Sequence, residues 1–336
     1  MRTDLINSNF GIGRRTLATF VLIGSIVAAM PAYAADKVEM GWLPATDALP
    51  YFVAVEEKLF EKYGIEVIDH KFTNPTTLVD AFVSNQIEVG PYGTAPGIAL
   101  AAEAQNPGTL KLFGFSGGIE GTEYVNSSLL VKKGSNIKTI TDLKGKKIGH
   151  MPGIQWQTNT KYILRNAGMN PDKDAILIGL APNTQIPAVV SGAVDALIAI
   201  EPMGSIAVSQ GDVVPIIINV GAKYVTNPWF GGGAVMTDKF IKERPAVAKR
   251  VMMALREATD HVNAHFDQYK PLLGKYVGVP KQSLPAVKKL IFVNERDAAA
   301  RDLKSEQNVL DILYKEKIIP KALKIEDKFV RMDDIK

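Results

Sequence analysis

The sequence of 336 residues contains no cysteine. The fold therefore cannot use a disulfide, a thiol nucleophile or a thiolate metal site, and no lipid can be attached through a cysteine. Long apolar runs are also missing: Leu17–Met30 has 14 residues, fewer than the roughly 20 that a membrane-spanning helix needs. Stability must come from a large hydrophobic core rather than from covalent cross-links.

The sequence also has little net charge. The formal charge is +4, and it falls to +2 without residues 1–34, which hold three arginines and one aspartate. Such a balance gives no indication of a nucleic acid or a membrane surface as a partner. The roughly 300 remaining residues are more than a single hydrophobic core usually contains, so we expect two lobes, each with its own core.

The first 34 residues predict a secretory signal peptide. Arg14 and Arg15 precede the apolar run, and Ala32-Tyr33-Ala34 supplies small residues at the spacing of a cleavage site after Ala34. We therefore expect an exported, periplasmic protein. The paired arginines match a twin-arginine signal only in part, so the Sec route and the twin-arginine route both stay open.

Helical and strand patterns alternate along the chain, which favours an α/β fold with mainly parallel sheets. One unit occurs twice, as residues 84–89 (SNQIEV) and residues 191–196 (SGAVDA). Each copy follows a predicted helix, has a residue tolerant of positive φ at its second position and an acid at its fifth, and leads into a buried strand. The repeat predicts the same αβ unit in each lobe.

Ligands bind beyond the carboxyl ends of parallel strands, and this rule selects five loops: residues 43–47, 91–95, 115–119, 152–158 and 201–205. A sixth loop, residues 226–233, precedes the strand expected at residues 234–237. All three tryptophans, Trp42, Trp156 and Trp229, lie in or beside these loops. Any one of them could equally fill the core, but their joint placement favours a ligand cleft. The loops contain no Lys or Arg, so an ionic ligand would depend on backbone N–H groups, helix dipoles and neutral side chains.

Residues 144–168 are predicted to form a strand, a loop and a helix. Pro152 and Gly153 end the strand, and the helix is expected to begin near Gln157-Thr158. Free backbone N–H groups at a helix start bind anions and polar ligand oxygens. Trp156 would add a stacking surface beside them.

Three further patterns allow other functions. Gly114–Gly118 fits the G-x-S-x-G elbow of a serine hydrolase with Ser116 as nucleophile, but glycines follow it where a helix is required, and histidine partners are scarce. His261 and His265 have an i, i+4 spacing without the other ligands of a metal site, which favours a solvated helix face. Glu201 could bind a ligand amine or ring nitrogen, or could pair within its lobe.

An ordered set of segments resembles the solute-binding proteins of ABC importers, in the nitrate, sulfonate and taurine group that also includes thiamine-precursor binders. The segments are residues 38–44 (VEMGWLP), 53–67 (VAVEEKLFEKYGIEV), 85–90 (NQIEVG), 129–135 (LLVKKGS), 142–149 (DLKGKKIG) and 191–196, with Glu201-Pro202. The likeness covers residues 38–239. It implies a type II periplasmic-binding-protein fold of two lobes joined by two crossovers, near residues 117–133 and 222–233, which close on a ligand like a hinge.

The resemblance also implies roles and boundaries. Lobe 1 would comprise residues 35–133 and 229–336, and lobe 2 residues 134–228. The partners would be a small organic solute and the permease subunits of an importer, with no nucleic acid, and the protein would be a monomer without cofactor, metal or catalytic activity. A thiamine-pyrimidine synthase on the same fold is disfavoured because such enzymes are cytosolic and rely on cysteine and histidine groups. The expected ligand-binding residues are Trp42, Leu43, Thr46, Tyr92, Thr94, Phe115, Ser116, Gly117, Gly153, Gln155, Trp156, Gln157, Thr158, Glu201 and Trp229.

Overall fold

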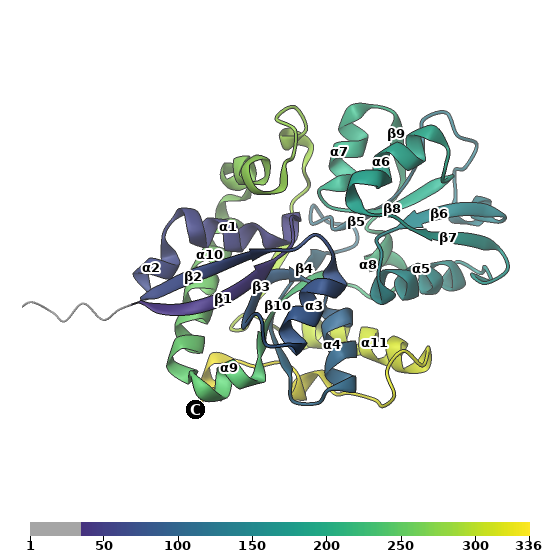
Figure 1. Ribbon diagram of the computed structural model, residues 1–336. Coiled ribbons are helices and arrows are strands. Elements are labelled where there is room, and N and C mark those ends of the chain that lie inside the picture. The colour runs from purple at the N-terminus through teal and green to yellow at the C-terminus, as the bar shows by residue number, and fades with distance from the viewer. Residues whose placement is uncertain (1–34) are drawn as a thin grey trace, which may run out of the picture. The chain divides into compact units, whose positions relative to one another are not determined.

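The computed structural model describes residues 35–336 (Figure 1). The predicted signal peptide and its cleavage site at Ala34 lie outside the described residues. Within residues 35–336, no helix is both long enough and apolar enough to cross a membrane. The same residues contain no group of three or more His, Asp or Glu side chains that could hold a metal ion.

The strands form two separate sheets. The six-stranded sheet has the order β11-β4-β10-β3-β1-β2, and the five-stranded sheet has the order β7-β6-β8-β5-β9 (Figure 1). The first sheet contains β1 (Asp36–Trp42), β2 (Ile65–Lys71), β3 (Val89–Thr94), β4 (Leu110–Gly118), β10 (Trp229–Thr237) and β11 (Ile291–Asn294). The second contains β5 (Ser127–Lys132), β6 (Lys146–His150), β7 (Ala175–Gly179), β8 (Ala196–Ile200) and β9 (Val213–Ile218).

Both sheets are mixed, so the expectation of mainly parallel sheets is corrected. Strand β1 pairs in parallel with β2 and β3, and β6 with β7 and β8, whereas β10, β11 and β5 pair only antiparallel to their neighbours. The alternation of helices and strands predicts parallel pairing only for strands joined by a crossover within one sheet. Strands β5 and β10 instead follow passages from the other sheet. Strand β10 lies between β3 and β4, and β5 lies between β8 and β9.

The pairing of β5 shows where the chain passes between the sheets. The expected boundary after residue 133 places residues 127–132 in lobe 1, whereas in the structure they form β5, which pairs with β8 and β9 in the second sheet. The first passage between sheets therefore lies between β4 and β5, at residues 119–126. The return lies between β9 and β10, where α8 (Val220–Tyr224) precedes the strand.

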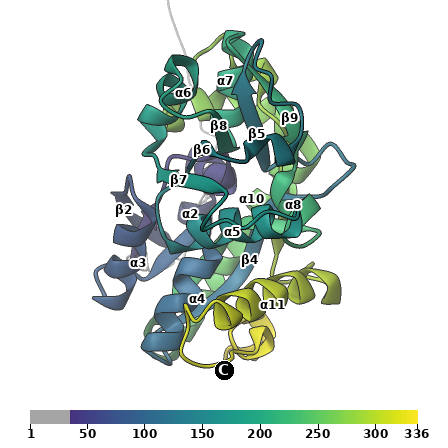
Figure 2. The same ribbon diagram turned by 90° about the vertical axis from the view of Figure 1, so that its right-hand side faces the viewer.

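Helices cover both faces of each sheet (Figures 1 and 2). In the first sheet, β10 divides its side chains between two cores: Ala234 and Met236 pack with α1 (Leu49–Glu56) and α10 (Pro245–Leu272), and Val235 packs with the helices of the other face. That other face carries α3 (Pro75–Val83), α4 (Pro96–Gln105) and α11 (Ala300–Lys315). The second sheet lies between α5 (Ile154–Asn166) with α8 and α6 (Pro182–Ser191) with α7 (Met203–Gln210). The short helices α2 (Leu59–Lys62) and α9 (Asp238–Glu243) complete the first lobe.

The repeated αβ unit is present in both sheets, and its acid has the same role in each. Asn85 and Gly192 end their helices with φ of 57° and 81°. The carboxylate of Glu88 accepts a hydrogen bond from the backbone N–H of Glu39 at 3.2 Å, and that of Asp195 accepts one from Lys147 at 2.8 Å. Each acid thus satisfies a backbone donor of the neighbouring parallel strand.

Candidate functional site

A cavity of about 70 Å³ lies where elements of the two sheets meet. The first sheet contributes the loop after β1, the end of β3 and Gly231 of β10, and the second contributes Met151, Trp156 and Ile200. The cavity therefore lies at the carboxyl ends of β1, β3, β6 and β8, as the rule for parallel strands predicts. Its lining residues are Leu43, Pro44, Ala45, Asp47, Thr73, Pro75, Gly93, Ala95, Met151, Trp156, Pro182, Ile200 and Gly231.

Asp47 is the one ionisable side chain among these lining residues. It is buried, and its Oδ1 accepts hydrogen bonds from Ser116 Oγ at 2.7 Å and from Asn126 Nδ2 at 3.3 Å. Burial raises the pKa of Asp47 to about 6, although the hydrogen bonds from Ser116, its own backbone N–H and Asn126 oppose the rise. The carboxylate is thus held by neutral donors, without a basic partner.

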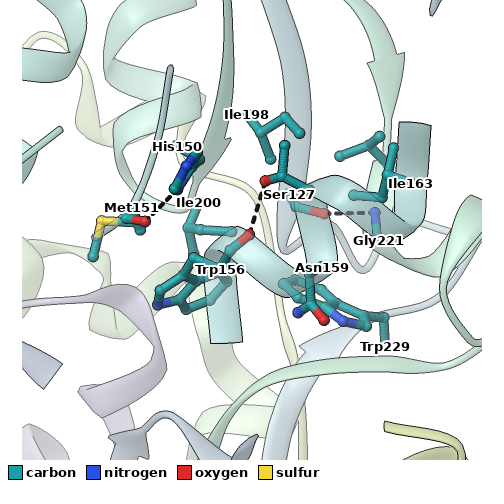
Figure 3. A pocket seen from close by; sticks show the side chains of 12 residues that line it. Ser127, His150, Met151, Trp156, Asn159, Ile163, Ile198, Ile200, Gly221 and Trp229 are labelled. Carbon is teal, nitrogen blue, oxygen red and sulfur yellow. Dashed lines mark hydrogen bonds between the residues drawn. The ribbon is translucent and has the colours of Figure 1, made fainter. Parts of the chain in front are cut away.

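A second, nearly filled pocket of about 10 Å³ shares Met151, Trp156 and Ile200 with the cavity. Figure 3 shows Trp156, Asn159 and Trp229 gathered at this pocket. The two indole rings meet edge to face, with centroids 5.7 Å apart. Trp156 Nε1, Trp229 Nε1 and Asn159 Nδ2 are buried donors with no hydrogen-bond partner in the part of the chain that the structure describes. Three unpaired donors in one place are costly unless a ligand or water accepts from them.

Gln155 connects the two sides of the site. Its Oε1 accepts a hydrogen bond of 2.6 Å from the backbone N–H of Gly97, at the start of α4. Helix α5 begins at Ile154 with Gly153 at its N-cap, so Gln155 and Trp156 lie in its first turn. The expected helix start at Gln157-Thr158 is therefore three residues too late.

Several residues expected in the cleft lie elsewhere in the core. Trp42 packs against Tyr51, Phe52 and Tyr276, and its Nε1 donates to Asp69 at 2.6 Å. The side chains of Tyr92 and Phe115 are also buried and do not line the cavity. Tyr92 packs against Phe292, and its hydroxyl is hydrogen-bonded to the carbonyl oxygen of Val293 and to Thr259 Oγ1. Phe115 stacks on Phe230 and on Phe329.

These residues are directed into the core because two expected loops are strands. Residues 91–94 continue β3, and residues 115–118 continue β4. Alternate side chains of a strand point to opposite faces, and both faces of this sheet are covered by helices. An aromatic residue after a predicted strand was therefore a poor indication of a ligand contact.

Of the remaining expected residues, some line the cavity or the adjoining pocket, and others lie beside them. Leu43 and Trp156 line the cavity, and Trp229 lines the adjoining pocket. Buried Thr46, Thr94 and Thr158 lie beside these elements, whereas Gln157 is exposed. Ser116 holds Asp47, and Gly153 caps α5.

Glu201 lines a different cavity, of about 180 Å³, together with Ser205 and Lys288. Burial raises the pKa of Glu201 to about 7, despite hydrogen bonds from Ser205 and the nearby positive charge of Lys288. Its Oε2 has no hydrogen-bond partner. Glu201 follows Ile200 in the chain, and the two adjacent side chains contribute to different cavities.

Gly117 supports the site through close strand packing. A Cβ at this position would come within 2.1 Å of the carbonyl oxygen of Trp229 and 2.8 Å of the Cα of Phe230. We expect Gly117→Ala to destabilise the protein by about 3 kcal/mol, since strand β10 cannot move away without losing its pairing with β4. Denaturant unfolding would measure this loss, with Gly179→Ala as control because its nearest neighbour would be 3.6 Å away. Equal stability of the two variants would contradict the prediction.

The structure does not form a nucleophile elbow at Ser116. The residue lies within β4, and its hydroxyl donates to Asp47 instead of to a histidine. An elbow requires a sharp turn from a strand into a helix. In the i, i+4 pair of histidines, α10 is interrupted at His265 (φ −134°, ψ 39°), and His261 Nδ1 contacts the carboxylate of Glu57 at 2.6 Å.

Sequence reasoning missed Asp47, Asn126, Asn159 and Met151. Asp47 is the last residue of one of the six expected loops. Because these loops contain no Lys or Arg, an acidic residue in them is a feature that could have identified Asp47 from the sequence. Asn126 lies in the passage between the sheets, and Asn159 lies one turn inside α5. Nothing in their sequence context distinguishes them from surface polar residues.

The NMT1-like family has a sequence model that matches residues 32–270. The chain belongs to this family. A Brucella abortus (strain 2308) protein named as a binding protein is 26% identical over 233 residues, which cover 69% of this chain and 68% of that protein. The 4-amino-5-hydroxymethyl-2-methylpyrimidine phosphate synthase THI13 of Saccharomyces cerevisiae is 24% identical over 242 residues, 68% of each chain.

Solved structures share the fold of this NMT1-like protein. The periplasmic aliphatic sulphonate binding protein SsuA from Escherichia coli superposes with a TM-score of 0.71 at 21% identity, covering 88% of this chain and 92% of that one. The periplasmic nitrate-binding protein NrtA from Synechocystis PCC 6803 gives a TM-score of 0.70 at 16% identity, covering 89% and 87%. The expected periplasmic-binding-protein fold is thereby confirmed.

Proposed function

We propose that this protein is the extracytoplasmic solute-binding component of an ABC importer. The observation that carries the proposal is the cavity at the joined carboxyl ends of strands from two sheets, with unpaired buried donors beside it. Membership of the NMT1-like family and the fold of sulfonate- and nitrate-binding neighbours support it. The solute is a small organic molecule with a flat or apolar part, because the lining is largely apolar and includes Trp156.

Capture requires the two lobes to move apart and then close. The cavity of about 70 Å³ is far smaller than the roughly 300 Å³ of an ordinary small-molecule site. The hydrogen bond from Gly97 to Gln155 and the ion pair between Arg165 and Glu316 join elements of the two proposed lobes. Opening breaks these contacts, and a bound solute replaces them in the closed form, which the permease recognises.

The proposed lobes follow the sheets. Lobe 1 contains the six-stranded sheet with the C-terminal helices, and lobe 2 contains the five-stranded sheet. The protein works as an exported monomer, since one cleft and one permease-facing surface suffice for delivery. Hydrolysis by Ser116 is not part of this proposal, because Ser116 lies within β4 and donates to Asp47, without the elbow and the histidine that hydrolysis needs.

A thermal-shift screen tests the proposal. The probes are organic sulfonates including taurine, aromatic carboxylates and pyrimidines. A true ligand should stabilise the protein by about 2.7 kcal/mol at a hundredfold excess over Kd, and small-angle scattering should show compaction on binding. Failure of every class, combined with a scattering profile that never changes, would overturn the proposal. Turnover of generic esters that disappears in Ser116→Ala would support the hydrolase instead.

Trp156 should contribute more to binding than to stability. Trp156→Ala removes the aromatic wall of the cavity and one unpaired donor, so we expect Kd to rise roughly 30-fold, or about 2 kcal/mol. Isothermal titration with a ligand found in the screen would measure the change. Trp42→Ala is the matched control, because it should lower stability while leaving Kd unchanged. Equal losses of stability and affinity in Trp156→Ala would show that this tryptophan is only packing.

A further inference from the structure

We propose that the solute carries a protonated amine or a comparable N–H donor, which Asp47 recognises, and an acceptor group at its other end. This inference rests on the proposed function. It names the chemistry of the ligand, which differs from the sulfonate and nitrate in the names of the two structural neighbours.

The charge at the cavity is negative. Asp47 lines it, and no Lys, Arg or His is among the other lining residues. A bare anion would lie near a carboxylate in a site largely shielded from water, where like charges repel strongly. An ammonium group in the same place would instead give the buried carboxylate the positive partner that it lacks.

The carboxylate of Asp47 is surrounded by residues of three segments of the chain. Ser116 of β4 and Asn126 of the first passage both donate to Oδ1. Strand β10 contributes Gly232, where a Cβ would come within 2.4 Å of Ser116 Oγ and 2.6 Å of Asp47 Oδ1. The strand therefore leaves room for the acid, and neutral donors fix its orientation without cancelling its charge.

Unpaired polar atoms indicate a ligand with two different ends. On the Asp47 side, the buried Asn126 Oδ1 is an acceptor without a partner, and it can share the several hydrogens of an ammonium group. On the side of the second sheet, Trp156 Nε1 and Asn159 Nδ2 are donors without partners. An amine at one end and an oxygen acceptor at the other would satisfy both sets.

Burial of Asp47 is unfavourable for its ionised form, and a role in ligand binding would explain why an acid lies at this position. Burial raises the pKa of Asp47 to about 6, so its ionised form is disfavoured in the ligand-free protein. Its side-chain hydrogen-bond partners in the described residues, Ser116 on β4 and Asn126 in the passage, are both neutral. Functional sites retain such groups for the interaction that they make with a ligand.

Matched pairs of probes test the proposal on the purified mature protein at pH 7.5. The pairs are taurine with ethanesulfonate, ethanolamine with ethanol, and benzylamine with benzyl alcohol, each measured by thermal shift and titration calorimetry. We expect at least one amine to bind at least 100-fold more tightly than its amine-free analogue. We also expect that preference to disappear in Asp47→Asn, which keeps an oxygen acceptor for Ser116 and Asn126. The exposed Asp172→Asn should bind like the parent protein.

The outcomes separate this inference from the proposed function. An amine-free analogue that binds as tightly as its amine, or that binds Asp47→Asn better than the parent protein, overturns the inference and leaves solute binding intact. If no probe, including the earlier screen, changes melting or scattering, the proposed function itself fails. Should Asp47→Asn not fold, the comparison of amine with analogue on the parent protein still decides the question. A preference for the amine that weakens as the pH falls below 6 supports the inference.

Discussion

Lowering the pH from 8 to about 5 should stabilise the ligand-free protein by several kcal/mol. Burial raises the pKa of three acids: Asp47 to about 6, Glu201 to about 7 and Glu306 to about 8. Their unfolded values are near 4, so the folded state binds more protons in this range, and stability increases as the pH falls. Below about 4 the trend should reverse, because carboxylates with lowered pKa values, such as Glu103, then lose their ion pairs.

Glu306 should account for the largest share of this effect. Both of its carboxylate oxygens are buried without a hydrogen-bond partner, and Asp47 and Glu201 have partners that Glu306 lacks. Glu306→Met removes the group, and we expect a gain on the order of 3 kcal/mol at pH 8. Urea unfolding at pH 5 and pH 8 would measure it. The variant should show a flatter pH dependence than the parent, and an unchanged dependence would contradict the assignment.

Glu103→Gln should destabilise the protein by about 3–5 kcal/mol at pH 7. The carboxylate of Glu103 is fully buried and accepts a hydrogen bond from Lys328 Nζ at 2.6 Å. It also accepts hydrogen bonds of 2.8–2.9 Å from the backbone N–H groups of Gly108, Thr109 and Leu110. Burial opposes its ionisation, but these bonds outweigh burial and hold the pKa of Glu103 below its ordinary value. Glutamine has the same size, yet its amide nitrogen cannot accept from these donors and cannot neutralise Lys328.

A double-mutant cycle separates the ion pair from the backbone bonds. Lys328→Met alone should cost less than Glu103→Gln, because the three backbone donors still hold the carboxylate. The coupling energy of the pair should fall in the range of about 0.5–3 kcal/mol. Glu243→Gln, at an exposed site, is the control for loss of one negative charge and should change stability by less than about 0.5 kcal/mol. A loss of that small size in Glu103→Gln would show that the buried carboxylate contributes little.

Glu103 and Glu306 have the same side chain and are both buried, yet we expect opposite effects from their removal. Glu103 lies near the end of α4 and faces the backbone that enters β4, where donors are abundant. Glu306 lies on α11, and within residues 35–336 neither of its oxygens has a hydrogen-bond partner. Burial alone therefore does not decide the contribution of an acid; its partners do.

The repeated αβ unit was predictable because its determinants are local. A residue with positive φ must follow the helix, and an acid placed three residues later reaches the backbone of the neighbouring strand. Asn85 with Glu88 and Gly192 with Asp195 satisfy both requirements. Turn conformation and the short reach of a carboxylate depend on few residues, so the pattern is visible in the sequence.

The contents of the candidate site were less predictable, because strand ends depend on pairing across the sheet. Strands β3 and β4 run past the expected ends since β10 pairs with both of them. The extra residues of β3 and β4 direct Tyr92 and Phe115 into the core, where loops would have left them at the cleft. Residues of β10 lie more than 100 positions later in the chain, and no local pattern reports such a partner.

The sequence by itself determined the α/β class, the repeated unit, the family resemblance and the position of the cleft at the carboxyl ends of the strands. These features follow from hydrophobic periodicity, turn residues and short motifs, which act over a few residues. Only the tertiary structure decided which side chains face the cleft. It brought Asp47 to Ser116 and Asn126, which lie about 70 to 80 positions later in the chain, and placed Trp42 in the core, because burial and hydrogen-bond partners are set by contacts between residues far apart in the chain.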